Sequence, residues 1–494
     1  MVHPGAQIIR TLQTLMLLLT LTLASCGTPA RRQGNTPLVA SAIGGAAVPG
    51  DPSAGRLDFA QRVVVGATGQ GLVRFDAGGG IQPGLAERWI VIDDGRSYIF
   101  RLREAHWSDG TPVTAAEVVR AIRRAAAVSS RNALAPYLAV IDQIVAMTPQ
   151  VIEVRLKRPR PDLLKLFAQP ELAVLRTPGL DGSGPFRARP AGGGVTLRAA
   201  SDSVNSAEDT ERSPGETLRL YGERAGVAIA RFRAGQSDLI LGGSFVDWPI
   251  AASSGINPAN LHADPAQGLF GFAVIRREGF LVDAANRAAL SMAIDRAALV
   301  QSVMPDWAPV ETLLPMQLDS ALPPALPTWT IMTLDARRQE ARARVRTWQQ
   351  AHPGGVTIRV ALPSGPGATL VWGHLASAML RIGVTPLRVA ADDPADLRLI
   401  DEVAPYDSGR WYVNTACIAC SPEAAALILA GREAPDLTTR ARRIADADAA
   451  LTADAAFIPI AQPLRWSAVA LRLTAWQRNT RAWHPLTHLR NEQE

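Results

Sequence analysis

Residues 83–121, PGLAERWIVIDDGRSYIFRLREAHWSDGTPVTAAEVVRA, decide the fold of this chain. Residues 89–92 are apolar and run into Asp93-Asp94-Gly95, a turn that suits a hairpin. Residues 97–102 then alternate polar and apolar side chains, as a half-buried strand does. The segment therefore predicts two strands joined by a tight turn.

A helix is expected directly after this hairpin. Asp109-Gly110 makes a second turn. Thr114 and Glu117 have the spacing of a capping box, in which each side chain bonds the other residue's backbone N–H at a helix start. The order strand, turn, strand, turn and amphipathic helix follows.

These motifs in this order resemble the signature of the family 5 extracytoplasmic solute-binding proteins, the peptide- and nickel-type receptors of ABC importers. Five further blocks resemble the family in its own order: 70–73 (QGLV), 182–186 (GSGPF), 232–238 (FRAGQSD), 286–299 (NRAALSMAIDRAAL) and 457–460 (FIPI). Gly235, in the third of these blocks, is a plausible helix C-cap.

The resemblance implies an α/β fold of the two-lobed, periplasmic-binding-protein type II-like kind. Its first lobe is discontinuous, and its mixed sheets are covered by helices. We expect lobe I over residues 56–275, with an inserted subdomain near 75–175. Lobe II is expected over 276–454, and residues 455–494 are expected to return to lobe I.

The N-terminus predicts export and lipidation. An apolar run over residues 15–23 is about half as long as a bilayer-spanning helix, so residues 1–25 are expected to be a signal peptide. Leu23-Ala24-Ser25-Cys26 resembles a lipobox, which would place acyl chains on Cys26. The alternative is an ordinary signal peptide with a chance cysteine. Residues 26–55 are rich in Pro, Gly, Ala and Ser, which predicts a flexible tether.

Composition excludes some classes of protein. The 494 residues are 47% hydrophobic, which is enough for a large core, and the net charge is +6. The cations are spread along the chain and form no basic patch with interleaved aromatics, so no nucleic-acid partner is expected. The motifs of Ser hydrolases, zinc proteases and P-loop enzymes are missing, so we expect neither an enzyme nor a cofactor.

The resemblance implies a substrate-binding component of an ABC importer. Such a protein captures a peptide or a similar small polar solute between its lobes and delivers it to permease subunits in the membrane. We expect a monomer outside the cytoplasm, on the periplasmic side or the cell surface, held to a bacterial membrane by its lipid. The alternative is an envelope sensing or interaction lipoprotein that keeps the fold and does not serve transport.

Candidate ligand contacts follow from the same resemblance. Gln70 stands where relatives often place an acidic residue, so a carboxylate for a ligand amine is missing there. For each aromatic candidate, packing in the core is an equal alternative. The candidates are Gln70, Leu72, Phe245, Trp248, Phe270, Asp407, Trp411 and Gln462.

Two further patterns involve Cys and His. Cys417 and Cys420 form a CxxC motif, for which a disulfide is the first interpretation outside the cytoplasm and a redox-active pair the second. His484 and His488 have the spacing of a helical metal clasp, but Pro485 between them favours a surface or packing role. No metal site is expected.

Overall fold

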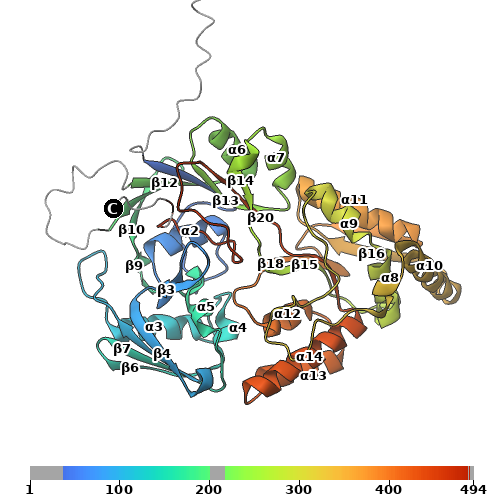
Figure 1. Ribbon diagram of the computed structural model, residues 1–494, viewed down its shortest axis with the longest axis horizontal. Coiled ribbons are helices and arrows are strands. Elements are labelled where there is room, and N and C mark those ends of the chain that lie inside the picture. The colour runs from blue at the N-terminus through green and yellow to red at the C-terminus, as the bar shows by residue number, and fades with distance from the viewer. Residues whose placement is uncertain (1–36, 201–216, 488, 490–494) are drawn as a thin grey trace, which may run out of the picture.

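The computed structural model describes residues 37–200, 217–487 and 489 (Figure 1). The predicted signal peptide, Cys26, residues 26–36 of the predicted tether, and His488 lie outside these residues.

The largest sheet has seven strands and mixes parallel with antiparallel pairs. β1 lies inside it and pairs in parallel with β12 and β13. All other neighbours in this sheet are antiparallel. In spatial order the strands are β10 (Phe186–Ala191), β11 (Gly194–Ala199), β12 (Thr217–Glu223), β1 (Leu38–Ile43), β13 (Leu239–Ser244), β20 (Arg465–Val469) and β14 (Leu261–Ala263).

The predicted hairpin is confirmed and belongs to a separate antiparallel sheet of four strands. β4 (Ala86–Ile92) pairs with β5 (Ser97–Leu102), and β7 (Val151–Leu156) and β6 (Ile141–Thr148) complete the order β4-β5-β7-β6. Gly95 in the turn has φ 85°, a left-handed conformation that glycine adopts without strain. Two short hairpins lie beside this sheet: β2 (Val73–Phe75) with β3 (Ile81–Pro83), and β8 (Leu175–Arg176) with β9 (Asp181–Gly182).

The predicted capping box is also confirmed. α3 (Ala115–Ala126) begins after Thr114, whose hydroxyl accepts the Glu117 N–H at 3.4 Å. The Glu117 carboxylate accepts the Thr114 N–H at 3.0 Å. The helix packs its apolar side on β6 and β7, so the whole segment forms one layer of helix on sheet.

A five-stranded mixed sheet forms the other side of the molecule. β16 lies in parallel with β17 and β18, whereas β15 is antiparallel to β18 and β19. All seven residues of β15 are buried. The spatial order is β17 (Val384–Val389), β16 (Val356–Ala361), β18 (Leu397–Val403), β15 (Gly268–Val274) and β19 (Phe457–Ala461).

Figure 1 shows one group of helices around the seven- and four-stranded sheets and a second group around the five-stranded sheet. Those near the seven- and four-stranded sheets are α2 (Phe59–Thr68), α3, α4 (Ala135–Leu138), α5 (Leu163–Phe167), α6 (Ala225–Arg233) and α7 (Trp248–Ser253). Those near the five-stranded sheet are α8 (Ala284–Ala293), α9 (Arg296–Val303), α10 (Leu334–Ala351), α11 (Pro366–Arg381), α12 (Gly409–Ala416), α13 (Pro422–Glu433) and α14 (Leu437–Asp454). The 3₁₀ turns of the described residues are η1 (Asp93–Gly95), η2 (Pro170–Leu172), η4 (Pro258–Asn260), η5 (Gly279–Val282) and η6 (Thr328–Ile331).

The chain crosses twice between the seven- and five-stranded sheets. It passes from β14 into β15, and it returns from β19 into β20. The two crossings are bonded to each other, because the Gly268 N–H donates to Gln462 Oε1 at 2.9 Å. Two short adjacent crossings are the arrangement about which two lobes can turn.

Two expected boundaries differ from the structure. β15 falls within the predicted lobe I (56–275) and β19 within the predicted return (455–494), yet both strands belong to the five-stranded sheet. The boundaries at 275 and 454 therefore move to the crossings, near 264–267 and 462–464. Strands that are apolar on both faces give no local sign of which sheet they join.

The predicted tether is also corrected in its second half. Residues 38–43 form β1, which is buried at every position. The short run LVASAI stands among Gly, Pro and Ala residues, so its strand character was masked by the composition around it.

No helix within the described ranges combines the length and the apolar character that crossing a bilayer requires.

Candidate functional site

The predicted contact Gln70 is buried inside the scaffold. Its side chain is bonded on both sides: Nε2 donates to the Ser183 carbonyl at 2.6 Å, and Oε1 accepts from Arg103 at 2.9 Å. Leu72, two residues further on, is 1% exposed and belongs to the core. Both residues therefore serve packing in this structure, and their predicted ligand contact stays a prediction.

Phe245 and Phe270 lie together in the core beside the five-stranded sheet. Each is 1% exposed, and their rings meet at 4.9 Å, edge to face. Trp307 closes the cluster at 4.7 Å from Phe270. Trp248 is less buried and contacts the Trp466 ring at 6.2 Å. The two phenylalanines therefore pack in the core, which was the alternative to ligand contact. Burial of their apolar rings stabilises the fold because it removes apolar surface from water.

Trp411 and Asp407 lie at the start of α12. Trp411 is 2% exposed and packs edge to face on Tyr412 at 4.9 Å. Asp407 forms ion pairs with Lys165 of α5 and with Arg481. Asp407 thus joins two distant parts of the chain, and its carboxylate is already neutralised by the protein's own cations.

Gln462 lies at the second crossing. Besides accepting from Gly268, it accepts the Trp307 indole N–H through its backbone carbonyl at 2.8 Å. Next to it, Arg465 holds both carboxylate oxygens of Asp401, at 2.8 and 3.0 Å. Burial raises the pKa of Asp401, and the Arg465 charge opposes that rise. These contacts fix the crossing as a bonded joint.

The eight predicted contacts are therefore not gathered around one open cavity. Instead, the segment around α5 is bonded to α12–α14, which lie beside it at the bottom of Figure 1. Arg440 of α14 is 2% exposed and donates to Asp162 at 3.0 Å and to Asp319 at 2.6 Å. Gln169 donates to the Pro405 carbonyl at 2.7 Å. Sequence reasoning missed this joint, since Arg and Asp residues are too common to mark it.

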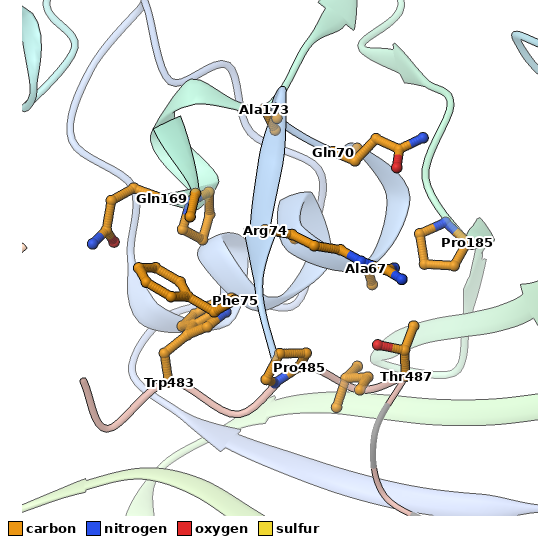
Figure 2. Close-up of a pocket in the computed structure, with 16 residues that line it drawn as sticks. Ala67, Gln70, Arg74, Phe75, Gln169, Ala173, Pro185, Trp483, Pro485 and Thr487 are labelled. Atoms are coloured by element: carbon orange, nitrogen blue, oxygen red, sulfur yellow. The ribbon is translucent and has the colours of Figure 1, made fainter. Parts of the chain in front are cut away.

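A pocket lies where α2, β2, residues 168–173 and the segment 483–487 meet (Figure 2). Its accessible volume is about 40 Å³, which holds a few water molecules. Gln70 and Arg74 line it, and none of the lining residues is acidic. We refer to it as the Arg74 pocket.

The alternation of β2 places Arg74 in this pocket. Val73 and Phe75 are at most 1% exposed, so the side chain between them leaves the core on the other face. Figure 2 shows the Arg74 side chain extending across the pocket between Gln70 and Thr487. Burial, with a smaller contribution from the Arg103 charge, lowers the pKa of the Arg74 guanidinium.

The cysteine and histidine patterns have structural partners. Cys417 and Cys420 are joined by a disulfide, with their Cα atoms 5.1 Å apart. His484 Nε2 lies 3.0 Å from Asp264 Oδ2, and both side chains are buried. Within the described ranges, no group of three or more His, Cys, Asp or Glu side chains is arranged to hold a metal ion.

Two mixed sheets linked by two adjacent crossings define a two-lobed binding-protein fold. Comparison with solved structures agrees. The crystal structure of Haemophilus influenzae OppA in complex with the peptide RPPGFSPFR matches with a TM-score of 0.76 and 17% identity, covering 91% of this chain and 98% of that one.

Sequence comparisons add similarities over parts of the chain. Residues 80–197 match the model described as bacterial extracellular solute-binding proteins, family 5 Middle. The probable deoxycholate-binding periplasmic protein YgiS of Escherichia coli is 45% identical over 71 residues, 14% of this chain and 13% of its own. The periplasmic oligopeptide-binding protein OppA of Salmonella typhimurium is 26% identical over 309 residues, 55% of each chain. Within residues 80–197, the chain is similar to the middle part of family 5 solute-binding proteins.

The sequence matches are partial in length. The matched part spans about half of the Salmonella protein and a much smaller part of YgiS.

Proposed function

We propose that this protein is the substrate-binding component of an ABC importer, which captures a peptide or a similar small polar solute between its lobes and delivers it to a membrane permease. The observation that carries the proposal is the double crossing between the two sheets. The match to the OppA fold over 98% of that chain supports it. The role is binding, so no catalytic residue is assigned.

The crossings supply the movement that such a role needs. A solute that contacts both lobes stabilises the arrangement in which they are close, and the population shifts by its differential affinity. Gln462 and the Arg465–Asp401 pair lie at the joint. In this proposal, Gln462 bonds the two crossings to each other and does not contact the solute. Trp248 and Asp407 are partly exposed, so they are the predicted contacts most accessible to a solute.

Export and anchoring are part of the same proposal. The protein acts outside the cytoplasm, attached to a bacterial membrane through acyl chains on Cys26. The Cys26→Ala variant is expected in the soluble fraction after cell breakage. Retention of that variant in the membrane fraction would contradict anchoring through Cys26.

A second function is favoured by a specific observation. Asp407 is neutralised by Lys165 and Arg481, and Phe245, Phe270 and Trp411 are at most 2% exposed. The side chains expected to contact a ligand are thus used in packing and ion pairs within the protein. This favours an envelope sensing or interaction lipoprotein that keeps the fold and does not serve transport.

A thermal-shift screen of the purified chain separates the two functions. The panel holds short peptides, opines, oligosaccharides, haem and nickel chelates. A ligand of the folded state adds ~2.7 kcal/mol of stability at a hundred times its dissociation constant. A selective rise in Tm supports the transport receptor and names its solute class. A flat panel from a cooperatively unfolding protein supports the envelope lipoprotein.

A further inference from the structure

We propose that the Arg74 pocket binds a small oxyanion, a phosphate or a carboxylate group, through the Arg74 guanidinium and the Thr487 hydroxyl. This goes beyond solute transport, because it needs neither a permease nor contact between the lobes. None of the residues that line the pocket comes from α8–α14 or the five-stranded sheet.

The first argument is the missing counter-charge. Among the described residues, the Arg74 side chain has no hydrogen-bond or ion-pair partner, and its Nε atom is buried without one. The neighbouring charge is Arg103, a second cation, whose guanidinium is bonded to Gln70. A partly buried cation without a counter-ion costs free energy that an anion would offset.

The second argument is an unused hydrogen-bond donor in the same pocket. Within the described ranges, the Thr487 hydroxyl is also buried without a hydrogen-bond partner. Figure 2 shows Thr487 to one side of the end of the Arg74 side chain, on the segment that carries Pro485. A guanidinium and a hydroxyl that line the same pocket are donors from which one oxyanion can accept together.

The third argument is size. The accessible volume of about 40 Å³ takes a few waters, the size of one phosphate or carboxylate group, and leaves no room for a peptide. The pocket is therefore suited to one anionic group, either free or at the end of a larger molecule.

The test is anion-dependent stability of the full chain, purified in detergent. Tm is measured against increasing sodium phosphate and, separately, sodium acetate, with sodium chloride keeping the ionic strength constant. We expect a saturable rise with at least one anion, and the two arms tell a tetrahedral from a planar group. Arg74→Gln is expected to weaken the apparent affinity by about tenfold or more, and Thr487→Val by about threefold.

Arg189→Gln is the matched control, because Arg189 is an exposed arginine on β10. It is expected to keep the wild-type response. An equal rise in Tm for Arg74→Gln and the wild type would overturn the proposal, as would a wild type that responds to neither anion. If Arg74→Gln does not fold, Thr487→Val decides, and an unchanged anion response in that variant overturns the assigned donors.

Discussion

Arg440 is buried and Arg74 is partly buried, but only Arg440 has counter-charges among the described residues. Arg440 donates to Asp162, Asp319 and the Ser408 hydroxyl within 3.0 Å. Arg74 has no such partner among the described residues. The first arginine joins the α5 segment to α14, so its environment is explained by the fold. For the second arginine the described part of the fold supplies no counter-charge, and the anion proposed above would supply one.

The same contrast applies to acids. Asp454 lies against Arg287 at 2.6 Å, and both side chains are at most 8% exposed. Asp448, also on α14, is 1% exposed and accepts only the Ala325 N–H, at 2.7 Å. Its second carboxylate oxygen has no partner in the part of the chain that the structure describes. Removing one partner of a buried ion pair is therefore expected to destabilise the fold, because the other charge is left buried alone. A buried charge that already lacks a partner is expected to destabilise the fold of the wild type.

The largest effect is expected at the paired arginine. Arg440→Met removes the cation and leaves the Asp162 and Asp319 carboxylates close together without it. The free energy of unfolding should fall by about 3–5 kcal/mol, as measured by urea denaturation. A loss below about 1 kcal/mol would mean that the joint between α5 and α14 does not depend on this pair.

The unpaired acid should give the opposite sign. Burial raises the pKa of Asp448 to about 6. In the unfolded chain, an Asp titrates near 3.9. Between these values the folded state binds more protons than the unfolded state, so the contribution of Asp448 to stability falls as the pH rises from about 4 to about 6.

Asp448→Asn removes that titration. At pH 7 the variant should be more stable than the wild type by about 1–3 kcal/mol, and the gain should vanish below about pH 4. Urea denaturation at a series of pH values measures both. A variant that is less stable than the wild type at pH 7 would contradict the assignment of Asp448 as an unpaired charge.

The smallest effect is expected where a pair is exposed. Arg443 lies one turn from Arg440 on the same helix and pairs with Asp446 at 3.2 Å, with both side chains 47% exposed. Arg443→Met should change the free energy of unfolding by less than about 0.5 kcal/mol, because solvent screens such pairs. An effect as large as that of Arg440→Met would show that burial does not separate the two arginines.

The parts of the fold that were predicted correctly from the sequence depend on local patterns. The hairpin at Gly95 and the capping box at Thr114 and Glu117 depend on residues a few positions apart, so short patterns specify them. The sheet that β15 joins depends instead on strands more than a hundred residues further on. For that reason the order of elements was predicted, and the boundaries between lobes were not.

The site could be predicted less well than the fold. Whether Phe270 faces a solute or the core depends on which strands flank it, and no local pattern contains that information. Arg74 is one arginine among many, and only the structure shows that it is left without a partner. Partnering is a property of the folded arrangement, so charge patterns in the sequence do not reveal it.

The most direct test of the central claim is equilibrium dialysis of the full chain against a mixture of short peptides, with the retained solute identified by mass spectrometry. The account predicts that a selected set of peptides is retained, at up to one per chain. A protein that unfolds cooperatively and yet retains none of the mixture would contradict its role as a peptide receptor.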